Sequence, residues 1–272
     1  MSNISKNSKS DKPIGVFDSG VGGLSVLKEI KKILPNENFV FLADQLYVPY
    51  GEKTKKQLID RCVKITDFFI KNHDIKMMVV ACNTATCGAI NELRGKYAFP
   101  IVGTVPAVKP ASLMTKSGTI GVISTPSTSK SIMLKNIIKE DCKGINILNI
   151  GCKNLENAVE EGDLYSPKVK KLMQKYLKAV SESKADYLVL GCTHYPFLRE
   201  PISKILRPGI KLLDSGGAIA KRTKVLLTAK NMKNKERVKG KTAYFTTGKS
   251  AKFSKVASTL LKAKIGSKTV KI

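Results

Sequence analysis

Two cysteines, Cys82 and Cys192, stand at equivalent places in two short stretches that resemble each other. The stretches are MMVVACNTAT, residues 77–86, and YLVLGCTHYP, residues 187–196. Each begins with an apolar run that predicts a buried strand, and each continues with a small residue, a cysteine and hydroxyl or amide side chains. In a parallel α/β sheet, ligands bind just beyond the carboxyl ends of the strands. The sequence therefore predicts two thiols at two equivalent binding edges.

A pair of thiols that face one small cleft is suited to proton transfer at a carbon atom. One cysteine, as a thiolate, removes a proton from one face, and the other, as a thiol, returns a proton to the opposite face. The stereocentre is thereby inverted. A free cysteine has a pKa of about 8.5, so neighbouring groups must tune it. The candidates are Asp18, at the end of another apolar run, and His194, two residues after Cys192.

Other mechanisms lack the residues that they need. Two histidines and scattered cysteines give no zinc-binding spacing. The sequence has neither the G-x-S-x-G motif of serine hydrolases nor the lysine motif of P-loop nucleotide sites. A cysteine hydrolase built on Cys192 and His194 stays open, although partners so close in sequence seldom meet at the required distance. We therefore predict no metal and no cofactor, and we interpret Cys62, Cys87, Cys142 and Cys152 as structural residues.

The elements that must position these residues begin with a strand–turn–helix pattern. Residues 13–18 form an apolar run, SGVGG at 19–23 is a glycine-rich turn, and residues 24–34 have helical spacing. The glycines nearly match a dinucleotide fingerprint, but Ser25 stands where the last glycine should be. The alternative is that they let the backbone approach a small ligand. Asp18 could equally serve only to cap the helix.

The same pattern restarts at Thr119, where TIGVISTPSTSKSIML resembles the earlier PIGVFDSGVGGLSVLK. The distance from Ile14 to Cys82 is 68 positions, and the distance from Ile120 to Cys192 is 72. We therefore predict an α/β fold with two similar domains, mainly parallel sheets, and the active site in the cleft between them.

Composition fits a globular enzyme in a reducing compartment. The 272 residues are 42% hydrophobic and 25% charged, and the polar N-terminus lacks the apolar core of a signal peptide. No apolar run approaches the roughly 18 residues of a membrane span, so a cytoplasmic protein is expected. Part of the net charge of +27 is local, because residues 230–272 contain thirteen basic residues and one acid. We interpret it as a solvated lysine-rich surface, with nucleic-acid binding as the less favoured alternative because few aromatics accompany it.

Five motifs, in chain order, resemble the glutamate racemases of the aspartate/glutamate racemase superfamily. They are DSGVGGLSVLKEI, ADQLYVPYG, ACNTAT, GCTHYPFL and DSGGAIA, and the likeness extends from about Pro13 to Gly248. ACNTA and GCTHYP together, at this separation, are highly specific. Two departures stand out: STPSTSKS lacks the Gly-Thr pattern expected there, and the basic tail after Gly248 lies outside the family pattern.

The resemblance implies a cofactor-independent enzyme that interconverts L- and D-glutamate for peptidoglycan synthesis, and a homodimer is an open expectation. Cys82 matches the cysteine that deprotonates D-glutamate and Cys192 the one that acts on L-glutamate, while Asp18 and His194 match the groups that assist them. Glu160, in VEEG, matches a further acidic position in the cleft. The implied substrate contacts are Asp18, Ser19, Tyr50, Gly51, Asn83, Thr84, Thr193 and His194.

The resemblance also implies a discontinuous first domain. We predict a disordered leader at 1–12, a first domain at 13–105 plus 209–272, and a second domain at 106–208. The chain is thus expected to return to the first domain after about Pro208, and its last residues are expected to be frayed. Two alternatives remain: an aspartate racemase, or a basic nucleic-acid-binding protein on the same scaffold.

Overall fold

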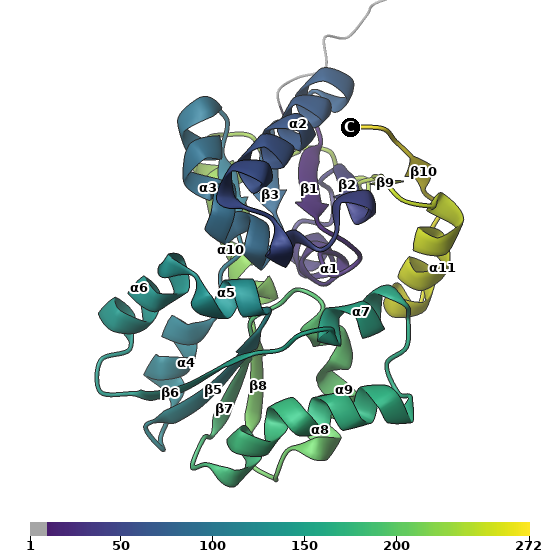
Figure 1. The fold of residues 1–272 in the computed structure, drawn as a ribbon. Helices are drawn as coiled ribbons and strands as arrows, with labels where there is room; N and C mark the ends of the chain where they lie inside the picture. The colour runs from purple at the N-terminus through teal and green to yellow at the C-terminus, as the bar shows by residue number, and fades with distance from the viewer. Residues whose placement is uncertain (1–9) are drawn as a thin grey trace, which may run out of the picture.

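The strand β1 (Ile14–Asp18) lies in the middle of the larger of two parallel sheets (Figure 1). The computed structural model describes residues 10–272. In β1 every residue of the run IGVFD is buried, as expected of a parallel strand that has helices over both faces. β1 pairs on one side with β2 (Phe39–Ala43) and on the other with β3 (Met77–Val80).

Two sheets account for the strands in the described part of the chain, and all their pairings are parallel. The larger has the order β10-β9-β2-β1-β3-β4 and the smaller the order β6-β5-β7-β8. The strands not yet given are β4 (Ile101–Gly103), β5 (Thr119–Ser124), β6 (Asn146–Gly151), β7 (Tyr187–Leu190), β8 (Lys211–Asp214), β9 (Thr242–Thr246) and β10 (Lys268–Thr269). The predicted α/β class with two parallel sheets is confirmed.

The internal repeat predicted from the sequence is visible in the strand register. Ile14 of β1 lies opposite Met77 of β3, and Ile120 of β5 lies opposite Tyr187 of β7. Each cysteine follows its strand at the same offset from this pair. The thiol-bearing loops are therefore equivalent in the two sheets, and each lies at a carboxyl edge.

Helices cover both faces of each sheet (Figure 1). They are α1 (Leu24–Ile33), α2 (Lys55–His73), α3 (Asn83–Lys96), α4 (Val108–Met114), α5 (Pro126–Lys130), α6 (Ile132–Asp141), α7 (Leu155–Glu160), α8 (Pro167–Glu182), α9 (Arg199–Ile205), α10 (Gly216–Ala229) and α11 (Ser250–Leu261). No helix within residues 10–272 is both long enough and apolar enough to cross a membrane.

Alternate residues of the strands enter cores on opposite faces of the larger sheet. Ile14 and Val16 pack with apolar residues of α1 and α10, whereas Phe17 packs with those of α2 and α3. The first of these cores continues into the smaller sheet, where it includes Leu188 and Val180. The two sheets are thus joined by a continuous apolar core on one side.

We predicted that the chain returns to the first domain after about Pro208, but the strand that follows Pro208 still belongs to the smaller sheet. β8 follows Pro208 but pairs with β7 in the smaller sheet, and the chain returns to the larger sheet only with α10, which packs on α1. The Ser215 hydroxyl, at this return point, donates to the carbonyl of Val105, where the chain leaves the larger sheet. The division into two domains otherwise stays a prediction.

Both ends of the described chain are more ordered than we expected. Residues 1–9 of the predicted leader lie outside the described residues, but Lys12 forms an ion pair of 2.7 Å with Asp74, and Lys76 donates to the carbonyl of Ser10. At the other end β10 pairs with β9, and the carbonyl of Ile272 accepts from Arg61. The prediction of a frayed C-terminal end is therefore wrong. A polar, basic sequence gives no local sign of these contacts, which depend on distant parts of the chain.

Candidate active site

Cys82 occupies the junction between β3 and α3. It is the N-cap of α3, where its Sγ accepts from the backbone N–H of Ala85 at 3.5 Å. Its thiol also lies 3.7 Å from the hydroxyl of Ser19, in the loop after β1. Burial raises the pKa of Cys82 well above the ordinary thiol value, and the nearby Asp18 carboxylate raises it further. Cys82 is therefore held as a thiol.

Cys192 follows β7 and is in contact with the histidine two residues later. Its Sγ lies 3.5 Å from Nδ1 of His194. A tight turn brings them together: the N–H of Tyr195 donates to the carbonyl of Cys192, and a short 3-10 helix, η3 (Tyr195–Leu198), begins there. The expectation that neighbours so close in sequence seldom meet is wrong here, because this turn folds the imidazole back over the thiol.

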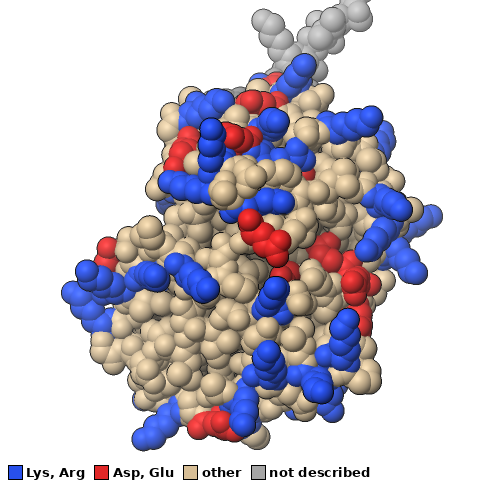
Figure 2. Space-filling model, in the orientation of Figure 1, with Lys and Arg blue, Asp and Glu red and all other residues tan. Residues whose placement is uncertain are grey.

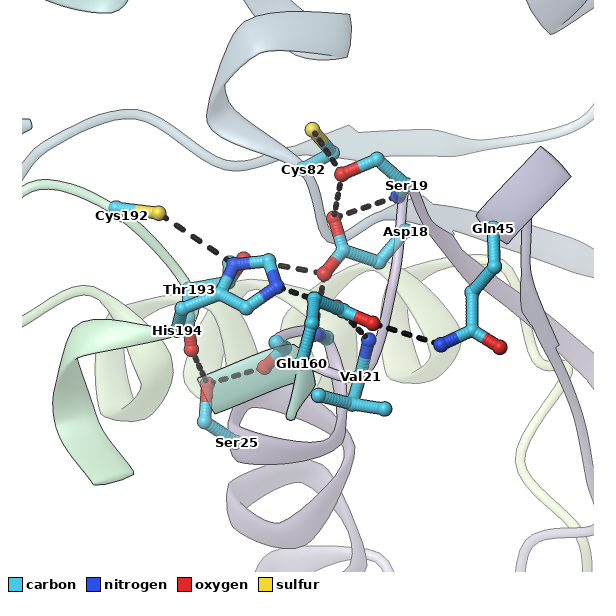
Figure 3. A network of polar contacts seen from close by, with 12 residues as sticks. Asp18, Ser19, Val21, Ser25, Gln45, Cys82, Glu160, Cys192, Thr193 and His194 are labelled. Carbon is cyan, nitrogen blue, oxygen red and sulfur yellow. Dashed lines mark hydrogen bonds and ion pairs between the residues drawn. The ribbon is translucent and has the colours of Figure 1, made fainter. Parts of the chain in front are cut away.

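His194 and Glu160 form a partly buried ion pair that joins the residue before η3 to the end of α7 (Figure 3). Nε2 of His194 lies 2.7 Å from Oε1 of Glu160, which also accepts from the N–H of Val21 at 2.6 Å. Burial lowers the pKa of His194, but the contacts with Cys192 and Glu160 outweigh it and leave that pKa well above its ordinary value. Burial raises the pKa of Glu160, and the hydrogen bond from His194 outweighs it, so this pKa is lowered. The pair is therefore ionised.

Asp18 lies behind Cys82 and Ser19 and is fully buried. Its carboxylate accepts from the N–H groups of Ser19 and Gly23 and from the hydroxyl of Thr193. Gly23 is the N-cap of α1, and no side chain caps the first turn of that helix, so Asp18 holds the loop before α1 and the helix-capping alternative is wrong. Burial raises the pKa of Asp18, and the positive charge of His194 opposes this effect.

One cavity of about 390 Å³ lies between the two sheets and holds most of the predicted site residues. Both Cys82 and Cys192 line it. The other predicted residues in its wall are Ser19, Tyr50, Gly51, Asn83, Thr84, Glu160, Thr193 and His194. Asp18 is not in the wall, so its contact with substrate stays a prediction, and its position supports the assisting role. Among residues 10–272, no group of three or more His, Cys, Asp and Glu could hold a metal.

Tyr50 lines the cavity while its hydroxyl points into a separate polar cluster. The hydroxyl donates to Oδ2 of Asp44 at 2.6 Å, and the same carboxylate accepts two hydrogen bonds from Arg61. Burial raises the pKa of Tyr50 well above its ordinary value, and the negative Asp44 adds to this effect. The hydroxyl of Tyr50 is therefore engaged by Asp44, and the contact of Tyr50 with substrate stays a prediction.

Sequence reasoning missed several residues of the cavity. Thr125 in the loop after β5 and Ser127 in the first turn of α5 line it, and Thr125 Oγ1 lies 3.2 Å from Oγ1 of Thr84. The internal repeat was the available signal, because this loop is equivalent to the one that carries Ser19. Lys153, Asn154 and Asn157 also line the cavity, from α7 and the loop before it, and no local pattern marked them.

The four other cysteines do not line this cavity. Burial raises the pKa of Cys62 and of Cys152 to about 12, and Cys142 is also buried, as expected of structural residues. Cys87, which we also expected to be structural, is only half-buried in α3. The two thiols that line the cavity are thus those of the two equivalent loops.

Comparison with known proteins gives a consistent assignment. A model of the Asp/Glu/Hydantoin racemase family matches residues 14–223. The chain is 43% identical to a glutamate racemase of Pseudomonas syringae pv. tomato over 219 residues, which is 80% of this chain and 79% of that protein.

Two solved structures are also similar to this chain. The glutamate racemase of Francisella tularensis in complex with D-glutamate is 29% identical, with a TM-score of 0.84 over 96% of this chain and 98% of that one. The Escherichia coli enzyme in complex with L-glutamate and the activator UDP-MurNAc-ala is 31% identical, with the same TM-score over 96% and 99%. This chain belongs to the Asp/Glu/Hydantoin racemase family.

Proposed function

We propose that this protein interconverts L- and D-glutamate without a cofactor. The observation that carries the proposal is that Cys82 and Cys192, from equivalent loops of two different sheets, line one cavity. Two proton carriers from opposite walls are what inversion at a carbon atom requires. The similar enzymes that hold D-glutamate and L-glutamate favour glutamate as the substrate.

The proposed reaction from L to D begins at Cys192. Its thiolate, beside the protonated His194, takes the α-proton, and the carbanion then receives a proton from the thiol of Cys82 on the opposite face. The reaction from D to L uses the same groups in reverse, with Cys82 as the base. The burial that keeps Cys82 as a thiol supports its role as proton donor in the first direction.

The remaining residues of the wall would hold the two carboxylates and the amino group. Asn83 and Thr84 form the first turn of α3, whose N–H groups favour an anion. Hydroxyls of Ser19, Thr84 and Thr193 supply further hydrogen bonds. The D-glutamate product would be used, within the cytoplasm, in peptidoglycan synthesis.

The test is circular dichroism of glutamate solutions with dialysed protein. Racemisation should abolish the signal of either enantiomer, and Cys82→Ser and Cys192→Ser should each reduce the rate by at least about 100-fold. Both are near-isosteric changes at the cavity wall, so the fold should persist. Cys87→Ser is the matched control and should keep its activity, because Cys87 does not line the cavity.

Full activity in either active-site variant would contradict the assignment of two bases. Aspartate, tested in the same assay, distinguishes the aspartate racemase alternative: equal or faster loss of its signal would contradict the choice of glutamate.

A further inference from the structure

A second cavity, of about 310 Å³, lies on the other side of Glu160. It shares Val48, Asn157 and Glu160 with the substrate cavity, and its remaining wall is polar: Gln45, Glu161, Gly248, Lys249 and Lys252. Its volume and its polar lining are sufficient for several water molecules. Glu160 therefore stands between the substrate cavity and a space that water can fill.

A continuous chain of contacts joins the Cys192 thiol to this second cavity (Figure 3). Sγ of Cys192 contacts Nδ1 of His194, and Nε2 of His194 contacts Oε1 of Glu160. The other carboxylate oxygen, Oε2, accepts from Nε2 of Gln45 at 2.7 Å. Oε1 of Gln45 accepts from the hydroxyl of Thr246 at 2.9 Å, which fixes the orientation of the amide.

Inversion by two thiols requires a route by which protons return to their starting positions after each turnover. When L-glutamate becomes D-glutamate, Cys192 gains the α-proton and Cys82 loses the proton that it donates. The enzyme is then ready only for D-glutamate. Before it can accept another L-glutamate, one proton must leave Cys192 for solvent and one must reach Cys82.

We propose that His194, Glu160 and the second cavity form the exit by which the Cys192 proton reaches solvent, with Gln45 as the positioning residue of Glu160. The proposal rests on the proposed racemisation. Nε2 of the protonated imidazole first gives its proton to Glu160, and Glu160 gives it to a water in the second cavity. The imidazole is then neutral, and in the tautomer that leaves Nδ1 free it takes the proton from Sγ, which restores the thiolate beside a protonated His194. Each bond formed is matched by one broken, so no co-reactant is needed.

The charges around the second cavity are consistent with this route. Lys249 and Lys252, from the start of α11, bring positive charge to the wall that holds Glu160 and Glu161. This charge favours the carboxylate of Glu160 after its proton has left. Cys82 differs, because the carboxyl group nearest to it, Asp18, is fully buried.

The first test is the change Gln45→Leu, which removes the hydrogen bond to Glu160 and one polar wall of the cavity. At low substrate, kcat/KM should stay close to the wild-type value. At saturating L-glutamate, kcat should fall about tenfold, because return of the free enzyme becomes limiting. Imidazole added as a small proton carrier should restore kcat. Gln174→Leu, the same change at an exposed site on α8, should behave as wild type.

The second test uses the wild-type protein in D₂O and stops at low conversion. Deuterium should enter the remaining L-glutamate faster than it enters the remaining D-glutamate in the reverse reaction, because Cys192 exchanges its proton through the exit. Equal exchange in both directions would overturn the proposal, and so would an unchanged kcat in Gln45→Leu or a loss that imidazole does not restore. Absence of racemisation by the wild type would instead contradict the proposed function.

Discussion

His194 and Glu160 illustrate how contacts between individual residues outweigh burial. Burial alone would leave both groups neutral, yet the contacts with Cys192 and Glu160 raise the pKa of His194, and the hydrogen bond from His194 lowers the pKa of Glu160. The raised pKa of His194 stabilises the fold below its ordinary value of about 6.5, and this contribution is lost as the pH rises through the raised folded value. The lowered pKa of Glu160 stabilises the fold above about 4.3, and this contribution is lost as the pH falls through the folded value.

The change Glu160→Gln tests this pair. Without the carboxylate, one of the two contacts that oppose the effect of burial is lost and the pKa of His194 should fall, so that activity toward L-glutamate drops about 10- to 100-fold at neutral pH. NMR titration of His194 and pH–rate profiles measure the effect. Urea unfolding should show that Glu160→Gln lowers the free energy of unfolding most at pH values between the folded pKa of Glu160 and that of His194. The difference from wild type should become smaller at pH values below and above this range.

The matched control is Glu182→Gln, at an exposed site on α8 whose ion pair with Lys178 spans 4.0 Å. It should leave the titration of His194 unchanged. A titration of His194 that is the same in Glu160→Gln and wild type would show that the pair does not set this pKa.

The sequence predicted the two thiols because each has a local signature, an apolar run that ends in a small residue and cysteine. It did not predict the contact between Cys192 and His194, since that depends on the turn into η3. Glu160 was identified only by resemblance, because it belongs to α7 and nothing nearby in the sequence links it to either cysteine. Gln45 was missed for the same reason.

Among the elements, the glycine-rich loop between β1 and α1 has a role that its sequence did not reveal. We expected its glycines to admit either a dinucleotide or a small ligand. In the structure they admit side chains from the other half of the protein: a Cβ on Gly20 would lie 1.8 Å from Oε1 of Glu160, and one on Gly22 would lie 2.4 Å from Nδ1 of His194. The loop is therefore shaped to seat the ion pair.

The change Gly22→Ala should displace His194 and lower the racemisation rate by about 100-fold, since small misplacements of catalytic groups have costs of this size. Gly217→Ala, in the first turn of α10, is the control, because its Cβ would meet nothing within 4 Å. Steady-state rates and urea unfolding of both variants separate a local effect from a global one. Equal activities in the two variants would show that the loop tolerates the methyl group.

The long elements were predictable and the short ones were not. Strands such as β1 and β3 are apolar throughout, and α2 has a capping box at Thr54 and Gln57 before its apolar face. The short helix α5 and the two-residue strand β10 have no comparable pattern, because tertiary contacts rather than local periodicity define them.

Across the whole molecule, charge is distributed rather than gathered into one basic strip. Figure 2 shows Lys and Arg over both halves of the visible face, with several Asp and Glu across its middle. This distribution favours the interpretation of the +27 charge as a solvated surface. Salt-sensitive DNA binding without turnover is the result that would favour the nucleic-acid alternative.

The ion pair between Asp44 and Arg61 lies in the interior and should contribute strongly to the free energy of unfolding. Asp44 is fully buried and accepts from Arg61 of α2, which also donates to the carbonyl of Ile272. Arg61→Met would leave the carboxylate unpaired, so the free energy of unfolding should fall by about 3–5 kcal/mol. Lys32→Met, which breaks the exposed pair with Glu29, should cost at most about 1 kcal/mol.

Urea unfolding of the two variants provides the comparison. If both lose the same small amount, Asp44 is compensated by Thr247 and Tyr50, its other hydrogen-bond donors, and Arg61 is not the principal partner.

The smaller sheet is an insertion whose two connections to the rest of the chain run next to each other, at Val105 and Ser215, where a hydrogen bond joins them. An insertion attached at two adjacent points can rotate about the line through them with both connections intact, as far as the apolar core shared by the two sheets allows. Each thiol-bearing loop belongs to one side of this line, so a swing that admits glutamate would separate the two sulfurs, and the reverse swing would bring them back to the same carbon. Substrate entry and assembly of the acid–base pair would then be a single movement.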